Sequence, residues 1–125
     1  FTIAPSPAEG SKAYARLVKM IGVASPDPYT TQVYDQINLI LMAIAIAGDT
    51  SGTAIKDAVR KISQAQGGAK VDNAIDGLKA IAAKQPVDYD GASGPCDFTE
   101  TGDIADCQFR YEQVQGGKLA LVKIA

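Results

Sequence analysis

Two cysteines and a short acidic turn are the residues of this sequence best suited to chemistry. Cys96 and Cys107 stand eleven positions apart, on either side of residues 97–103. This spacing excludes a CxxC redox pair. It leaves two interpretations: a disulfide that clamps the turn to the strands that follow, or two small buried thiols. The disulfide would close a small loop and contribute roughly 3 kcal/mol to stability.

The acidic turn resembles a calcium-binding loop only in its first half. Asp97 takes the first position, Thr99 and Thr101 the third and fifth, and Gly102 the sixth. A calcium loop also needs a bidentate Glu at its twelfth position, where this sequence has Gln108. We therefore expect an Asx-type turn with Gly102 at positive φ, and no metal site.

The sequence contains no histidine, which removes the commonest general base and the usual partner of a serine or cysteine nucleophile. Its close carboxylate pairs, Asp88 with Asp90 and Asp103 with Asp106, lie in expected turns, where carboxylates are normally solvated. Acid–base catalysis needs two carboxylates in different environments. We therefore expect a protein that is not an enzyme and that uses no cofactor.

The bulk composition limits the classes of partner. The chain has 125 residues, 46% of them hydrophobic, and a net charge of −2, which fits one domain with its own core. Its Lys and Arg residues are scattered, so nothing predicts binding to nucleic acid. The longest apolar stretch, residues 39–47, is shorter than the roughly 20 residues that a bilayer-spanning helix needs.

The first half of the chain predicts a short strand over residues 1–5 and two helices. Ser6 has the features of an N-cap, with Pro7 at the first helical position and Glu9 completing a capping box, and Gly22 ends this helix. A second helix is expected over residues 29–47. Asp27 and Pro28 precede it and Gly48 terminates it, and its second half is apolar on all sides and should be deeply buried.

The second half predicts two more helices and then strands. The third helix is expected over residues 52–64, with residues 66–68 breaking it, and the fourth over residues 71–84. After Pro86 the pattern changes to strands, first at residues 87–89 and then at 108–114 and 119–124. Gly116 and Gly117 lie between the last two strands, which is a hairpin signal.

The order of these motifs resembles one protein family. Residues 88–103 follow the pattern Y-x-G-x-S-G-P-x-x-F-x-x-x-G-D, a strand from Phe109 to Val114 comes next, and residues 33–48 resemble the family's "YDAV" helix. This sequence is similar to the C-terminal end of the leucine/isoleucine/valine-type, or type I, periplasmic substrate-binding proteins of ABC transporters. It departs from that pattern at Gln36, where alanine is commoner, and in its cysteine pair.

The resemblance implies an α/β fold in which the chain, residues 1–125, is the C-terminal segment of a two-lobed protein. Helices over residues 7–84 would lie on one lobe and the strand and hairpin region 87–124 would return to the other, with hinges at Pro5, Gly94 and Pro95. Beginning at Phe1, inside a strand, the chain would be a piece that lacks both central sheets. Exposed apolar stripes would then associate with the remainder of the protein or with another copy.

The resemblance also suggests where a ligand lies. Residues just before the Tyr34-Asp35 pair come near the cleft between the lobes in this family, so Tyr29 and Thr31, with Tyr34 behind them, are candidate ligand-binding residues. A helix N-terminus suits a carboxylate. The alternative is structural, with Tyr29 packing against the helix start and Tyr34 packing in the core.

The function that follows is capture of a small solute, an amino acid of the branched-chain kind or another small carboxylate, for delivery to an ABC permease. Such a protein is exported to the periplasm, with a signal peptide outside this chain, and an oxidising compartment favours the Cys96–Cys107 disulfide. The alternative is a cytoplasmic ligand-sensing regulatory domain of the same fold, in which the two thiols would stay reduced.

Overall fold

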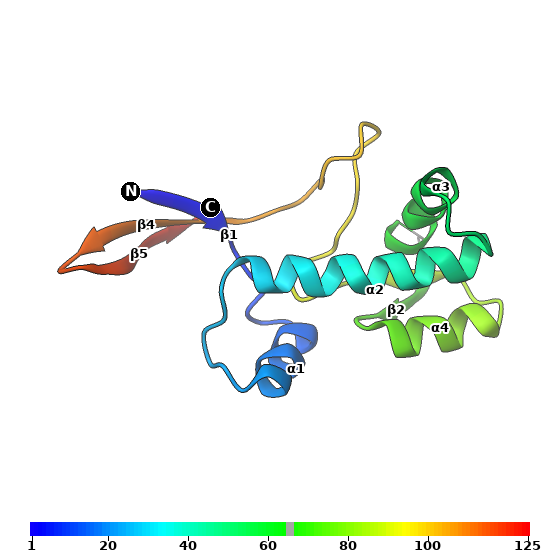
Figure 1. Ribbon diagram of the computed structural model, residues 1–125, viewed down its shortest axis with the longest axis horizontal. Coiled ribbons are helices and arrows are strands. Elements are labelled where there is room, and N and C mark those ends of the chain that lie inside the picture. The colour runs from blue at the N-terminus through cyan, green and yellow to red at the C-terminus, as the bar shows by residue number, and fades with distance from the viewer. Residues whose placement is uncertain (65–66) are drawn as a thin grey trace.

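The protein folds into two regions joined by two connecting segments. One leaves the first strand through Ser6, and the other enters the fourth strand through Gln108. The structure, a computed structural model, describes residues 1–64 and 67–125. Within these residues it has four helices and five strands, which confirms a mixed α/β class. Figure 1 shows a sheet at one end, which we call the terminal sheet, and a helical body at the other. Both chain ends lie at the terminal sheet.

The terminal sheet contains the first and the last strands of the chain. Its order is β1 (Thr2–Pro5), β4 (Phe109–Gln115) and β5 (Lys118–Ile124), and both pairings are antiparallel. Gly116 and Gly117 form the turn between β4 and β5 at φ values of 58° and 79°, a left-handed conformation that favours glycine. The expected first strand and the C-terminal hairpin are therefore confirmed.

The longest helix, α2 (Tyr29–Ala47), has the predicted bounds. The Asp27 carboxylate accepts a hydrogen bond from the Tyr29 N–H at 2.9 Å, and Gly48 ends the helix at φ 63°. The expectation that the second half is deeply buried is wrong, because only one side of it meets the helical body. Ile40 and Leu41 remain 42% and 47% exposed.

Helix α1 (Lys12–Ile21) begins later than predicted, with Ser11 rather than Ser6 as its N-cap. The Ser11 side chain accepts a hydrogen bond from the Tyr14 N–H at 3.1 Å. The segment before it is held in a non-helical path by distant partners, since the N–H groups of Ser6 and Ala8 donate to backbone carbonyls of residues 108 and 92. These tertiary hydrogen bonds override the local capping signal.

Helix α3 (Gly52–Ser63) forms as predicted. Of the residues expected to break it, Gln66 lies outside the described residues, whereas Gly67 adopts a φ of 76°. The fourth helix, α4 (Ala74–Ala82), starts three residues late because residues before it form the strand β2 (Ala69–Val71), which the sequence did not indicate. Strand β2 pairs in parallel with the predicted strand β3 (Val87–Tyr89).

Small residues bring α4 close to α2. The buried side of α4 consists of Ala74, Gly77 and Ala80. A Cβ atom at Gly77 would lie 2.1 Å from the Met42 sulfur, so a side chain at this position would displace Met42. The larger Ile75 of α4 lies on the other side of the helix and is 69% exposed.

The main core lies between α2, α3, α4 and the pair β2–β3. Its fully buried side chains include Met42, Ile62, Val87 and Tyr89. A second, small cluster joins α1 to α2 around Leu17. Within the described residues no single helix has both the length and the apolar composition to cross a membrane; α2 and α3 meet that test only together, as a pair bent by 106°.

Candidate functional site

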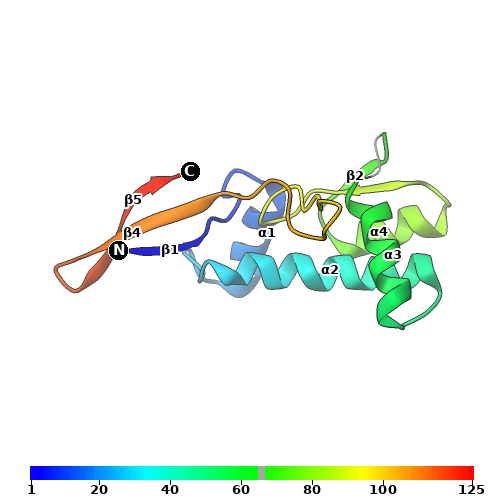
Figure 2. The same ribbon diagram turned by 90° about the horizontal axis from the view of Figure 1, so that it is seen from above.

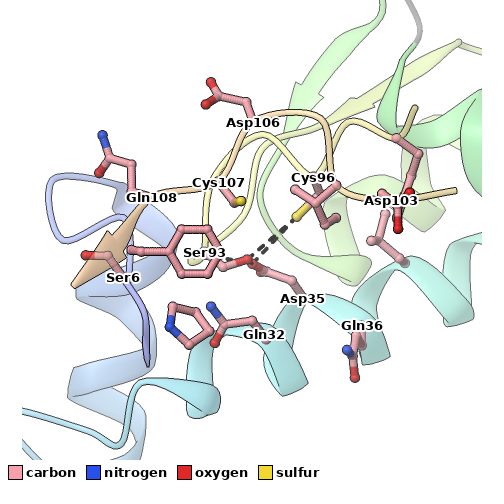
Figure 3. A pocket seen from close by; sticks show the side chains of 15 residues that line it. Ser6, Gln32, Asp35, Gln36, Ser93, Cys96, Asp103, Asp106, Cys107 and Gln108 are labelled. Atoms are coloured by element: carbon pink, nitrogen blue, oxygen red, sulfur yellow. Dashed lines mark hydrogen bonds between the residues drawn. The ribbon is translucent and has the colours of Figure 1, made fainter. Parts of the chain in front are cut away.

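A pocket of about 500 Å³ lies where the chain passes from the terminal sheet into the helical body. Figure 3 shows the side chains that line it. They come from the end of β1 and the residue after it, from one face of α2, from residues 93–98, and from residues 103–109. The pocket therefore touches both connecting segments and both regions of the molecule.

One face of α2 forms a wall of this pocket. Gln32, Asp35, Gln36 and Leu39 follow one another at i, i+3, i+4 and i+7, so they share a single side of the helix. This face carries two amides and a carboxylate, and its last member is a buried leucine. The wall thus passes from polar to apolar along α2.

Asp35 is a buried carboxylate surrounded by hydrogen-bond donors. Its side chain belongs to a residue only 2% exposed. Oδ1 accepts from the Tyr89 hydroxyl at 2.7 Å and from the Ala92 N–H at 2.9 Å, and Oδ2 accepts from the Ser93 N–H at 2.6 Å and from the Ser93 hydroxyl. A buried carboxylate is tolerated only when its lone pairs are satisfied in this way. Asp35 therefore fastens α2 to the segment after β3, residues 90–96, which we call the corner.

The corner can approach Asp35 because it contains Gly91. A Cβ atom at this position would lie 2.3 Å from the Asp35 Oδ1 atom, which no backbone adjustment of a few tenths of an ångström relieves. Two further residues of the corner have positive φ, Gly94 at 128° and Cys96 at 59°. The corner is thus shaped by its contact with α2 rather than by its sequence alone.

The Asp35 site perturbs the acidity of two neighbouring groups. Burial, together with the negative charge of Asp35, raises the pKa of the Cys96 thiol from 9.0 to about 12. The same two causes, burial first, raise the pKa of the Tyr89 hydroxyl well above its ordinary value. Both groups are protonated near neutral pH, and the Cys96 thiol is therefore a poor nucleophile.

The two connecting segments run side by side, as Figure 2 shows from above, and residues of both line the pocket. The Ser6 N–H donates to the Gln108 carbonyl at 2.8 Å, directly after the last β1–β4 pair, Pro5 with Phe109. Of the predicted hinge residues, Pro5 lies in this crossing. Gly94 and Pro95 lie in the corner and line a smaller pocket of about 180 Å³ that also includes Ser6 and Gln108.

The three predicted ligand residues do not line the main pocket. Tyr29 is 58% exposed, and Thr31 is fully buried with its hydroxyl donating to the Pro28 carbonyl at 3.2 Å. The Tyr34 hydroxyl instead meets α1 and the residue after β2, because it donates to the Asp72 carbonyl at 3.4 Å and lies 3.5 Å from the Arg16 guanidinium. The α2 residues that do line the pocket include Gln32 and Asp35, which directly follow the predicted Thr31 and Tyr34 in the chain.

Arg16 links α1 to the rest of the helical body. Its Nη2 atom forms an ion pair with Asp72 Oδ1 at 2.8 Å and donates to the Asp72 carbonyl at 2.8 Å. The hydrogen bond to Asp72 is the main cause that raises the pKa of Arg16 above its ordinary value. Nearby, the Asn38 side chain accepts from the Ala74 N–H at 2.6 Å, which fixes the start of α4 on α2. These contacts are structural and lie away from the main pocket.

The predicted Cys96–Cys107 disulfide is not formed. Both cysteines line the main pocket, yet both thiols are free. Cys96 is buried, and its sulfur lies 3.4 Å from the Gly94 carbonyl and 3.7 Å from Asp35 Oδ2, whereas Cys107 is exposed. The contacts of the Cys96 sulfur are therefore with the corner and Asp35.

The acidic turn has Gly102 at a φ of 98°, as predicted, but the Thr99 hydroxyl is its side-chain acceptor, in place of the aspartate of the expected Asx-type turn. The Thr99 hydroxyl accepts from the Asp103 N–H at 3.1 Å, and the Thr101 hydroxyl donates to Asp103 Oδ2 at 2.8 Å. Arg60 of α3 donates to the Glu100 carbonyl at 2.7 Å and ties the turn to the helical body. Among the described residues, no group of three or more His, Cys, Asp or Glu side chains is arranged to hold a metal ion.

Sequence reasoning missed the Asp35 site and most of the pocket. A carboxylate in the middle of an apolar helix was the available signal, because Asp is rarely buried unless it is paired or hydrogen-bonded. The remaining lining residues are brought together only by the crossing of the two connecting segments. Comparisons with protein-family models, with curated protein sequences and with solved structures found no match to this chain.

Proposed function

We propose that this chain is the C-terminal part of a two-lobed, type I periplasmic-binding-protein fold and that it binds a small solute for an ABC transporter. The solute is an amino acid of the branched-chain kind or another small carboxylate. The partners are the remainder of the binding protein and the membrane permease, and the compartment is the periplasm. The observation that carries the proposal is the pocket at the double crossing, the place where the two connecting segments pass together between the terminal sheet and the helical body.

The double crossing is what a hinged solute-binding protein requires. Two regions that close on a ligand need short connections that absorb the motion, and such hinges are a few residues at the ends of regular elements. Here the connections pass through Ser6, at the end of β1, and Gln108, at the start of β4. A solute in the pocket would contact both regions and stabilise the closed arrangement.

Unpartnered apolar surfaces support the proposal that this chain works with further protein. One side of α2 presents an exposed apolar stripe with helical spacing, made of Tyr29, Val33, Ile37, Ile40 and Leu41. In the terminal sheet, Val114, Leu119 and Leu121 are 64%, 58% and 52% exposed. Apolar surfaces of this extent are normally covered by another part of the protein or by a partner. In the proposed fold the central sheets of the two lobes cover them.

Scanning calorimetry of the full chain with candidate solutes tests this proposal. The panel is L-leucine, L-isoleucine, L-valine and the carboxylate 4-methylpentanoate, with glycerol as a control solute. A solute present at 100 times its Kd adds about 2.7 kcal/mol of stability, or a rise in Tm of several degrees. We expect at least one member of the panel to give this rise and glycerol to give none. A Tm that no member of the panel changes contradicts the proposed function.

The free thiols favour one second candidate, a cytoplasmic ligand-sensing regulatory domain of the same fold. A membrane-impermeant maleimide applied to intact cells whose outer membrane has been permeabilised separates the two candidates. Because Cys107 is exposed, it reacts if the protein is periplasmic. It stays unmodified until the inner membrane is lysed if the protein is cytoplasmic.

A further inference from the structure

We propose that the main pocket admits an uncharged, largely apolar group of the solute and excludes a carboxylate. The inference rests on the proposed function and deepens it, because it states which end of the solute enters this pocket. It places the charged end of the solute elsewhere. Three features carry it: the volume of the pocket, its charge balance and the direction of its carboxylates.

The pocket has the size and the surface for a ring or a branched alkyl group. A cavity of roughly 150 Å³ already admits benzene, and this pocket is about 500 Å³. Pro5, Leu39, Phe98, Ile104 and Phe109 give it apolar walls. Burial of such a group against these walls is favourable in proportion to the apolar area removed from water.

The charge balance of the lining opposes an anion. The lining includes the carboxylates of Asp35, Asp103 and Asp106, and none of the lining residues in the described part of the chain is Lys or Arg. A carboxylate in the pocket would leave water without gaining a cationic partner, and it would be repelled by charges that are only partly screened.

The same carboxylates offer little to a cation. Asp35 is occupied by donors from the corner, and Asp103 accepts the Thr101 hydroxyl. Figure 3 shows the Asp106 side chain directed away from those of Gln32 and Asp35. Neutral polar groups remain at the pocket, chiefly the amides of Gln32 and Gln36. An uncharged group that can accept or donate a hydrogen bond therefore fits best.

Cys107 gives a readout at the pocket itself. Its exposed thiol lines the pocket, whereas the buried Cys96 thiol, with its pKa near 12, stays protonated. The rate at which iodoacetamide modifies Cys107 in the full chain is followed by mass spectrometry with benzamide, benzoate or benzylamine present. These three probes share a ring and differ in charge.

We expect benzamide to slow the modification of Cys107 at concentrations at least tenfold lower than benzoate or benzylamine. Equal protection by benzoate, or better protection by benzylamine, overturns the proposal, as does the absence of protection by benzamide. This experiment and the calorimetric test of the proposed function can fail independently. Stabilisation by an amino acid without protection by benzamide contradicts this inference alone, and the reverse contradicts the proposed function alone.

A charge introduced at the pocket should reverse the preference. Gln32 lines the pocket from α2, and Gln32→Arg supplies the missing cation. We expect the ratio of benzoate to benzamide protection to rise roughly tenfold in this variant. Gln115→Arg makes the same chemical change in the hairpin, outside the pocket, and should leave the ratio unchanged. An unchanged ratio in a folded Gln32→Arg variant overturns the charge argument.

Discussion

The helical body and the terminal sheet hold their buried polar groups in different ways. The helical body buries a carboxylate, Asp35, and surrounds it with donors from the corner and from the fully buried Tyr89. The terminal sheet instead leaves apolar side chains such as Val114 and Leu119 more than half exposed. Its one well-buried polar contact, Arg110 with Glu112 at 3.1 Å, lies within a single strand.

This difference indicates which part of the chain is held by its own contacts. A buried, fully satisfied polar site fixes one arrangement of α2 and the corner, because every alternative leaves donors unpaired. A three-stranded sheet with exposed apolar side chains has no such restraint, and it becomes more stable when another protein surface buries those side chains. The pocket lies between the two regions, so a solute there would contact a rigid wall on α2 and a more adjustable sheet.

The largest expected effect comes from removing the centre of the rigid region. Asp35→Ala leaves the N–H groups of Ala92 and Ser93 and the Tyr89 hydroxyl without their acceptor. We expect a loss of at least about 3 kcal/mol in the free energy of unfolding, measured with urea. Asp57→Ala, at an exposed aspartate of α3, is the matched control and should change stability by less than about 0.5 kcal/mol. A similar small loss for both variants would refute the role of Asp35.

A smaller loss is expected when the corner is forced away from α2. Gly91→Ala places a Cβ atom 2.3 Å from Asp35 Oδ1. We expect a cost of about 2 kcal/mol in urea unfolding, within the range of overpacked sites. The control is Gly10→Ala, where an added Cβ meets nothing within 4 Å and φ is not positive. If Gly91→Ala is as stable as this control, the close approach of the corner is not required.

Alkaline pH should weaken the rigid region through Cys96. Because its pKa rises from 9.0 to about 12 on folding, the fold binds the thiol proton more tightly than the unfolded chain does. This contribution is complete below pH 9 and is lost as pH rises toward 12, by up to about 1.4 kcal/mol per pH unit. Urea unfolding between pH 9 and 11 measures the slope. Cys96→Ala should reduce the slope, leaving the part above pH 10 that comes from the raised pKa of Tyr89, and Cys107→Ala should not change it; equal slopes in all three proteins contradict this account.

The smallest effect on stability should accompany a clear effect on association. Ile37 is 54% exposed in the α2 stripe, so Ile37→Glu should change the free energy of unfolding by less than about 0.5 kcal/mol. If two copies of the isolated chain associate through the α2 stripe, Ile37→Glu disrupts that association and lowers the solution mass measured by light scattering. Gln36→Glu introduces the same charge on the pocket side of α2 and serves as the control. If Ile37→Glu leaves the oligomer intact, the copies associate through a surface other than the α2 stripe.

Local signals predicted the elements well where local contacts decide them. The bounds of α2 follow from Asp27 and Gly48, and the hairpin follows from Gly116 and Gly117. The start of α1 was misplaced because Ser6 and Ser11 both have cap chemistry, and only the tertiary hydrogen bonds of residues 6 and 8 select Ser11. Strand β2 was missed because its three residues pair with residues of β3 that lie eighteen positions later in the chain.

The candidate site was harder to predict than the fold. Tyr29, Thr31 and Tyr34 belong to the predicted part of α2, but the register of the helix turns Gln32 and Asp35 to the pocket instead. The sequence predicted a Cys96–Cys107 disulfide and no pocket, whereas both free thiols line the pocket and the Cys96 sulfur lies 3.7 Å from Asp35 Oδ2. The second difference depends on the corner, which is fastened to a carboxylate more than fifty residues earlier in the chain.

Closure of the two regions on a solute is tested most directly by the distance between them. Spin labels at Gln115→Cys in the hairpin and Lys61→Cys on α3, in a Cys107→Ser background, report this distance by double electron–electron resonance. With saturating L-leucine we expect the distribution of distances to narrow and to shift to shorter values. A distribution that stays unchanged while the solute is bound would contradict closure around the pocket.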